Sequence, residues 1–590
     1  MQSMHQYRRF GAHIERQYER DREKAAAGRI TGGGDDGQSP QAIVRSGSSS
    51  SPSSSSPSSS FASATSDREL NFHDTSKPSN ILTAAHCNVP PNATSHPPDS
   101  RELSDPEKGS LTIGPLTTQR SQGTALGETL TGIAVRSRTT HEGGKGDRVF
   151  VVGYEGEDDV LNPHNWSYAT RVGATVIIAA IGWIVGFASS VDSAALVQAS
   201  QDFGVSEVTE SLATGLFLIG FGVGALFAGP ISETVGRNPV YIATLSLYMV
   251  FVMASALAPN IGAQLAFRFI AGCFASTPLT CAGGSLSDLW SPMERVWAFP
   301  VFANAAFMGP IFGPVVGGFV GQSRLVSWRW TEWITLIISG LVLAMVIFFQ
   351  PETYAPVLLS WKAKKLRELT GDERYKAGVE IRDVGLGKRL THALYRPFML
   401  TLREPIIMLV ALYLSVIYII LFTFLNGYTF IFTETYGFSQ GITGLSFIGI
   451  GIGLCLASAL VPLIYSWAKK DLATIQEQGG SRLPPEFRLW FAMLGAPFIT
   501  ISILWMAWTT RPSISYWSPL VASVVFGYGI LCVFISCYQY IIDGYETYAA
   551  SALASVTLIR YVVAGGMVEV AVSTPSRCVL FANAIADTIL

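Results

Sequence analysis

Charged side chains inside long apolar stretches are the residues of this sequence best placed to do chemistry. Arg268 lies within such a stretch, where an unpaired guanidinium is costly and cannot be neutralised by losing its proton. We therefore expect a carboxylate, backbone carbonyls or water beside it. The other ionisable side chains within these stretches or at their ends include Asp192, Glu332, Arg560 and Glu569.

Proton transfer is the chemistry that this set would support. No histidine falls within the apolar stretches, so a proton relay would depend on carboxylates assisted by arginine. Burial can raise the pKa of a carboxyl group into the physiological range. Two simpler interpretations stay open from the residues alone: Arg268 anchors its helix, and Asp192, Glu332 and Glu569 reach the membrane surface from the helix ends.

The apolar stretches are long enough to cross a membrane. With 49% hydrophobic and 14% charged residues and a mean hydropathy of +0.33, the chain is too apolar for a soluble protein of 590 residues. A helix needs about 20 residues to cross about 30 Å of hydrocarbon. We expect spans near residues 172–191, 210–229, 240–258, 262–286, 297–321, 330–350, 404–432, 442–466, 488–509, 516–541 and 547–572.

The polar segments predict the topology and the domains. Residues 351–403 are rich in lysine and arginine, so the positive-inside rule places this central loop, and with it the N-terminus, in the cytoplasm. Residues 1–170 are rich in serine, glycine and proline and predict a disordered cytoplasmic tail without a signal peptide. The remaining domains are a six-helix bundle over 171–350 and a second helix bundle over 404–590.

Glycine and proline recur at regular spacing in residues 309–318 (GPIFGPVVGG). Gly309, Gly313 and Gly317 form one smooth stripe on a helix, against which another helix backbone can lie closely. Pro310 and Pro314 predict a bend on the adjacent face. Further glycines in the second and eighth spans suggest that those two spans pack against each other.

Several motifs, in order, carry a family resemblance. They are NPHNWS at 162–167, GPISETVGRN at 229–238, RFIAG at 268–272, GPIFGPVVGG at 309–318, PETY at 351–354 and YAASALA at 548–554. In these motifs the chain resembles the major facilitator superfamily and, within it, the fungal twelve-spanner drug:proton antiporters of the multidrug-resistance branch. The resemblance covers residues 160 to 570 or so.

The resemblance assigns roles to the loop after the second span. Glu233 and Arg237 are four residues apart and can pair on a helical turn, and Gly229 and Gly236 allow tight reversals. A surface ion pair is the simpler interpretation, whereas the resemblance implies a latch onto the second half of the protein. A comparable cytoplasmic charge cluster is expected from Asp288, Glu294 and Arg295.

The resemblance also implies a transport path. It gives Arg268 a part in proton coupling, with Glu332, Asp192 and Glu569 as candidate carboxylates, and it makes residues 309–318, Gly318 included, an antiporter motif. We expect the substrate between the two halves. Its candidate contacts are Tyr418, Phe422, Asn426 and Tyr538, although side chains of this kind more often pack helices or face lipid.

The expected molecule is an all-α, multi-pass major facilitator protein with two six-helix halves, of which the twelfth helix is missing or truncated because residues 579–590 are too short to cross. It would export small hydrophobic compounds such as drugs, toxins or secondary metabolites by proton antiport, as a monomer in the plasma membrane. No enzyme activity, cofactor, metal or nucleic acid is expected. The alternatives are a proton-coupled nutrient importer and a non-transporting membrane sensor or scaffold.

Overall fold

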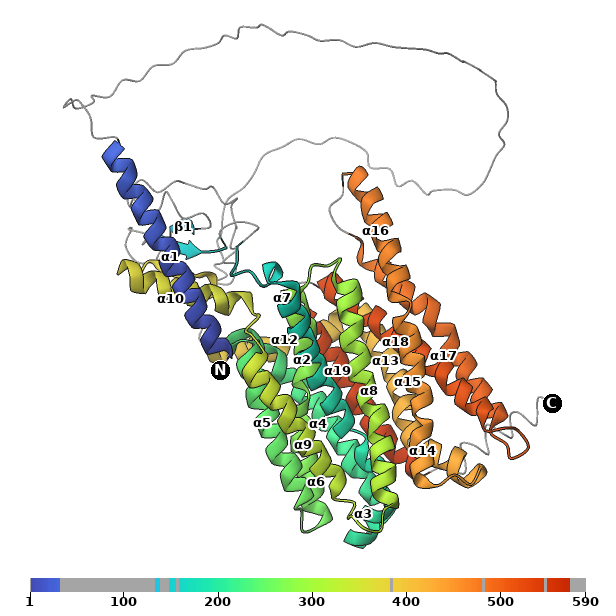
Figure 1. Ribbon diagram of the computed structural model, residues 1–590. Helices are drawn as coiled ribbons and strands as arrows, with labels where there is room; N and C mark the ends of the chain where they lie inside the picture. Colours follow the sequence, from blue (N-terminus) through green and yellow to red (C-terminus); the bar gives the residue numbers. More distant parts are fainter. Residues whose placement is uncertain are drawn as a thin grey trace, which may run out of the picture. The chain divides into compact units, whose positions relative to one another are not determined.

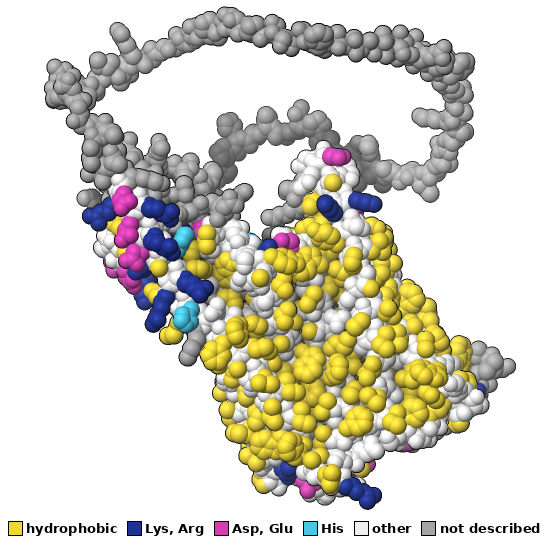
Figure 2. Space-filling model, viewed as in Figure 1, with side chains coloured by type: hydrophobic (Ala, Val, Ile, Leu, Met, Phe, Trp, Pro, Cys, Tyr) yellow, Lys and Arg dark blue, Asp and Glu magenta, His cyan; other side chains and the backbone are white. Residues whose placement is uncertain are grey.

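The computed structural model describes residues 2–31, 133–137, 148–154, 159–381, 386–479, 483–545 and 549–573. Within them, 11 helical segments are long and apolar enough to cross a membrane, which agrees with the predicted spans. They run side by side as one bundle (Figure 1). Figure 2 shows hydrophobic side chains over the flank of this bundle, with charged side chains gathered at its ends.

The first half holds six of these segments. Its helices are α2 (Tyr168–Ala188), η2 (Val191–Ala195) and α3 (Leu196–Phe203), which together form the first segment, then α4 (Glu207–Val235), α5 (Arg237–Ala256), α6 (Ile261–Ala275) with α7 (Thr277–Leu289), α8 (Arg295–Gln322) and α9 (Trp330–Phe349).

The second half holds the other five. They are α13 (Pro405–Tyr428) with η3 (Thr429–Thr435), the run of α14 (Gln440–Ser446), α15 (Ile448–Ser458) and α16 (Val461–Glu477), then η4 (Pro485–Leu489) with α17 (Trp490–Thr509), α18 (Trp517–Tyr545) and α19 (Ala549–Ser573).

A small polar subdomain lies at the predicted cytoplasmic end. Strand β2 (Arg148–Val152) pairs antiparallel with β1 (Ile133–Ser137) and parallel with β3 (Tyr375–Ala377). Beside this sheet lie α1 (Gln2–Thr31) and α10 (Ala355–Thr370) (Figure 1). The short helix α11 (Gly378–Ile381) contacts β3 and α10, whereas η1 (Pro163–Asn165) contacts α7, and α12 (Leu386–Arg403) packs on α19, α4 and α13.

The prediction of a disordered tail is wrong for residues 2–31 and for strands β1 and β2. Ile14 of α1 and Phe150 of β2 are buried in one apolar cluster with Leu366 of α10 and Tyr375 of β3. The tail therefore folds where it finds apolar partners more than 200 residues away in the central loop, which composition alone does not reveal. The serine-rich part of the tail lies outside the described residues.

Helix α8 packs closely on both of its sides. A Cβ atom added at Gly309, Gly313 or Gly317 would clash with Trp183, Ser190 or Val191 respectively, so the glycine stripe contacts α2 and η2 within the first half. Gly318 instead meets Gln440 of α14, and Gly444 of α14 meets the Pro314 backbone. The expected close packing of this stripe is confirmed, and α8 joins the two halves.

The predicted contact between the second and eighth spans is wrong. Helix α4 packs along α19, whereas α15 packs along α18 and α8. The glycines in question serve these other neighbours: Gly222 meets the carbonyl of Leu558 in α19, and Gly453 meets the backbone of α18. A glycine pattern identifies a smooth helix face but not the helix that covers it.

Candidate functional site

A buried ion cluster lies in the first half. The guanidinium of Arg268 on α6 forms ion pairs with Asp192 of η2 and with Glu332 of α9, the latter at 2.6 Å. Arg268 also donates to the carbonyl of Ala188 at 3.1 Å. Arg268 is 2% exposed, Glu332 0% and Asp192 9%. The structure thus brings together three predicted site residues that are distant in sequence, and both carboxylates are buried inside the protein.

Hydroxyl groups orient the two carboxylates. Ser255 of α5 donates to Glu332 Oε1 at 2.8 Å, and Thr331 donates to Asp192 Oδ1 at 2.8 Å. Two carboxylates and one guanidinium carry one net negative charge when all three are ionised. One proton would bring the net charge of the cluster to zero.

An aromatic centre lies where the two halves meet. Phe307 of α8 contacts Tyr418 of α13 and Phe534 of α18, with ring centroids 5.8 and 4.8 Å apart. Tyr538 stacks on Phe534 at 4.2 Å, and Tyr561 of α19 lies 4.4 Å from Phe221 of α4. These rings close the middle of the bundle.

The aromatic rings leave a central cavity of about 20 Å³, lined in part by Tyr418, Phe422, Tyr561 and Phe307. This volume holds about one water molecule. Tyr418 and Phe422, two of the predicted substrate contacts, therefore line the cavity, and Tyr538 belongs to the same ring cluster. The side chains of Asn426 and of the candidate carboxylate Glu569 lie outside the described residues.

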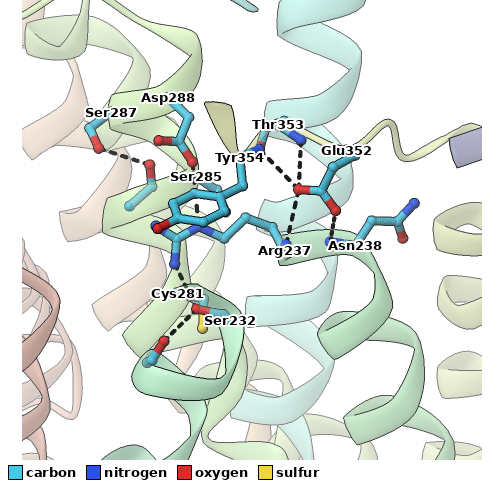
Figure 3. A network of polar contacts seen from close by, with 12 residues as sticks. Ser232, Arg237, Asn238, Cys281, Ser285, Ser287, Asp288, Glu352, Thr353 and Tyr354 are labelled. Atoms are coloured by element: carbon cyan, nitrogen blue, oxygen red, sulfur yellow. Dashed lines mark hydrogen bonds and ion pairs between the residues drawn. The ribbon is translucent and has the colours of Figure 1, made fainter. Parts of the chain in front are cut away.

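The loop between α4 and α5 forms a different network from the one predicted. Gly236 ends α4 with φ of 111°, so Glu233 and Arg237 do not share the helical turn that was predicted. Arg237 pairs with Asp288 of α7 at 3.4 Å and donates to Ser232 Oγ at 2.6 Å, both within the first half (Figure 3).

Glu352, which follows α9, holds this loop in place. Its carboxylate accepts the backbone N–H groups of Arg237 and Asn238 at 3.0 and 3.1 Å, and those of Thr353 and Tyr354 at 3.0 and 2.9 Å (Figure 3). Burial raises the pKa of Glu352 above its usual value, while the N–H groups of Tyr354, Arg237 and Asn238 act in the opposite direction. The loop between α4 and α5 and the start of the central loop are therefore held together as one unit.

The ion pair between the halves belongs to Arg295. Its guanidinium lies 3.1 Å from Asp543 of α18, which also pairs with Arg488 of η4 at 2.6 Å. Arg488 in turn donates to the carbonyl of Pro292 in the first half at 2.7 Å. We call Arg295, Asp543 and Arg488 the inner gate.

Asp288, Glu294 and Arg295 do not form the single charge cluster that was predicted. Asp288 pairs with Arg237, and Glu294 pairs with Arg171 of α2 at 3.0 Å. The three residues lie at different places along α7 and α8, so each meets the helix that packs beside it. A vestibule of about 960 Å³ at the predicted cytoplasmic end is lined by Asp288, Arg295 and Glu233, among others.

The opposite end of the bundle is closed by α14. Gln440 donates to the carbonyl of Ala194 in η2 and accepts from Gln198 at 3.0 Å. The N–H group of Gly441 donates to Gln322 of α8 at 2.9 Å. We call these contacts the outer gate.

Comparison with known proteins gives the family. The family model described as Major Facilitator Superfamily matches residues 178–567. The chain belongs to the major facilitator superfamily. The MFS-type transporter kojT of Aspergillus flavus is 57% identical over 424 residues, which cover 72% of this chain and 75% of that protein. The MFS-type transporter traF of Penicillium crustosum is 36% identical, covering 70% and 83%.

Among solved structures, the xylose transporter XylE from E. coli in a partially occluded inward-open conformation is similar with a TM-score of 0.46 and 16% identity, covering 68% of this chain and 93% of XylE. The family match over residues 178–567 decides the general function, because the major facilitator superfamily consists of transporters of small molecules rather than enzymes. This protein is therefore a multi-pass membrane transporter with the major facilitator fold.

Three residues that take part in these networks of the major facilitator protein are not predicted from the sequence: Glu352, Asp543 and Arg488. Asp543 lies in α18 and Arg488 at the start of the preceding segment, so the cost of an ionisable group within an apolar stretch was a usable signal for both. Glu352 lies in the PETY motif at 351–354, but its four backbone partners include the two residues that follow Gly236, more than 100 residues away.

Proposed function

We propose that this transporter exports small hydrophobic compounds in exchange for protons by alternating access, as a monomer in the plasma membrane with its N-terminus in the cytoplasm. The observation that carries the proposal is the buried cluster of Arg268, Asp192 and Glu332. Its net charge changes from minus one to zero when a single proton binds. Charge inside the bilayer is costly, so the cluster is sensitive to its proton load.

Asp192 connects the proton site to the outer gate. It lies in η2, and Ala194, two residues further on, accepts the hydrogen bond from Gln440. The same short helix packs on the glycine stripe of α8 through Val191. Protonation of Asp192 would weaken its attachment to Arg268 and free η2 to move. The outer gate would then respond to the proton load of the cluster.

Two further observations support export. The vestibule at the predicted cytoplasmic end offers an entry for compounds from the cytoplasm. The aromatic centre provides rings that suit apolar ligands of varied shape. Glu569, whose side chain is not described, stays a predicted second carboxylate, and Glu233, Arg237 and Asp288 stay predicted latch residues that would bias one state of the cycle.

The test is proton-driven flux in vesicles that contain the purified full chain. A hydrophobic dye should accumulate against its own concentration gradient while protons flow in the opposite direction, down the imposed proton gradient. Asp192→Asn should abolish this accumulation but retain downhill exchange. Asp202→Asn is the matched control, because Asp202 pairs with Arg329 and is half exposed. Movement of the dye together with protons would indicate an importer, and an absence of any flux would indicate a sensor or scaffold.

A further inference from the structure

Among the described residues of the spans, Arg268 and Arg560 are the most deeply buried arginines, and of these two only Arg268 is matched by carboxylates. Arg268 has Asp192 and Glu332. Arg560 of α19 is 0% exposed, and within the described part of the chain none of its three guanidinium nitrogens has a hydrogen-bond partner. No ion pair is found for it among those residues either. The next acidic residue along α19, Glu569, lies about 13 Å away along the helix axis.

Aromatic rings surround this guanidinium instead. Its Cζ atom lies 4.2 Å from the ring centroid of Tyr418, 4.8 Å from Tyr561, 5.4 Å from Tyr538 and 5.6 Å from Phe534. Cation–π attraction offsets part of the cost of removing the charge from water. These cation–π contacts provide no hydrogen-bond acceptor for the N–H donors of the guanidinium. Such donors bind best to a planar anion. We call these four rings and Arg560 the arginine cage.

The arginine cage forms a wall of the central cavity. Tyr418 and Tyr561 line that cavity. Tyr561 also packs on Phe221 of α4, and the carbonyl of Leu558 lies against Gly222 of α4, so this part of α19 is the contact surface between the halves. A separation of the halves at this surface would widen the cavity beside Tyr561 and make the neighbouring guanidinium accessible.

We propose that Arg560 is the counter-charge for the anionic group of an aromatic or conjugated substrate, with the substrate ring lying among Tyr418, Tyr538 and Tyr561. This proposal rests on the proposed export function and names its substrate class: planar organic acids that carry one negative charge, as a carboxylate or an ionised hydroxyl. A neutral apolar compound would leave the buried charge unmatched. A monoanion replaces the missing chain carboxylate and uses the unpaired N–H donors.

Binding measurements on the purified full chain test the proposal without requiring transport. The probes are 2-naphthoate and its neutral counterpart 2-naphthamide, and the readout is the rise in unfolding temperature with probe concentration. Wild type should bind 2-naphthoate at least about tenfold more tightly than the amide, as expected for a charge-assisted hydrogen bond. Arg560→Met should lose this preference, whereas Arg560→Lys should retain part of it. Arg329→Met is the control, because Arg329 forms a partly exposed ion pair with Asp202 away from the cage, and it should bind both probes as wild type does.

Equal binding of the two probes to wild type, or an unchanged preference in Arg560→Met, would overturn the proposal. If Arg560→Met does not fold, Tyr538→Leu removes one ring of the cage and should weaken binding of the anion; an unchanged affinity would again count against the site.

Flux assays distinguish this proposal from the proposed export function. Anion binding without proton-driven flux of any compound would keep the site and reject export, and proton-driven flux of a neutral dye without anion preference would do the reverse.

Discussion

Two buried carboxylates depend on the single guanidinium of Arg268. If Arg268 is replaced by methionine, Asp192 and Glu332 are left with one another in a space that excludes water. Breaking a buried ionic group in this way typically costs about 3–5 kcal/mol. We predict that Arg268→Met lowers the unfolding temperature at neutral pH, measured by thermal unfolding of the detergent-solubilised protein.

Removing the two carboxylate charges as well should restore part of this stability. The triple variant that also carries Asp192→Asn and Glu332→Gln has no charge in the cluster, so no carboxylate is left without its guanidinium. It should unfold at a higher temperature than Arg268→Met does. Equal unfolding temperatures of the two variants would show that the carboxylates do not interact there.

Part of this cluster could be predicted from the sequence. Because a guanidinium in an apolar stretch is costly, the sequence predicts partners for Arg268. Only a few carboxylates, at the ends of other apolar stretches, are candidates. Which of them would pair depended on how α2, α6 and α9 pack, and that packing is set by contacts far apart in the chain. The inner gate was not predicted, because Arg295 and Asp543 are brought together only when the two halves meet.

Helix α8 illustrates how an element can be predicted while its partner is not. The spacing of Gly309, Gly313 and Gly317 predicts a smooth face, and the structure places α2 and η2 against it. At Gly313, an added Cβ atom would clash with Ser190 and lie 2.9 Å from the backbone nitrogen of Val191. Because backbone atoms cannot move aside as a flexible side chain can, α8 itself would have to shift.

We predict that Gly313→Ala destabilises the protein by about 1–3 kcal/mol, the usual cost of overpacking, and reduces proton-driven flux because η2 carries Asp192. Thermal unfolding and the vesicle assay measure the two effects. Gly340→Ala on α9 is the matched control, because the nearest atom to its added Cβ is the end of the Met249 side chain at 3.6 Å. The control should be neutral or stabilising, since alanine favours a helix. Equal behaviour of the two variants would contradict the close-packing argument.

Helix α1 contacts the loop network at the predicted cytoplasmic end directly. Gln6 donates to the carbonyl of Glu352 at 3.0 Å and accepts from its N–H group at 2.8 Å, and Asn238 donates to Ser3 at 2.5 Å. Gln6 therefore binds the residue that holds Arg237 and Asn238. Composition places α1 in a polar tail, so these contacts could not be predicted from it.

We predict that Gln6→Ala loosens α1 without unfolding the spans. Two hydrogen bonds contribute roughly 1–3 kcal/mol in total, so opening of α1 should become about tenfold or more frequent. Hydrogen exchange followed by mass spectrometry would show faster deuterium uptake in residues 2–20. Arg16→Ala is the control, because Arg16 is exposed and donates only within α1, to the carbonyl of Ala12. Unchanged exchange in Gln6→Ala would show that the apolar contacts of Ile14 alone hold the helix.

At the scale of the whole molecule, alternating access requires the two gates to work in opposition. The inner gate joins the halves through Arg295, Asp543 and Arg488, and the outer gate through Gln440. The inner gate borders the large vestibule, whereas the centre of the bundle is filled by aromatic rings. If both halves move as packed units around α8, as the proposed function requires, a change that weakens one gate should close the other.

We predict that Asp543→Asn shifts the population toward the state open at the vestibule. Loss of the two ion pairs of Asp543, at a partly buried site, should favour that state by about 1–2 kcal/mol, or roughly 5- to 30-fold. Single cysteines in a cysteine-free background report on each end: Ser287→Cys lies in the vestibule and Ala194→Cys at the outer gate. In Asp543→Asn, a maleimide reagent should label Ser287→Cys faster and Ala194→Cys more slowly.

Faster labelling at both positions would indicate general loosening rather than a coupled cycle. Unchanged labelling at both would show that the ion pairs of Asp543 do not hold the halves together.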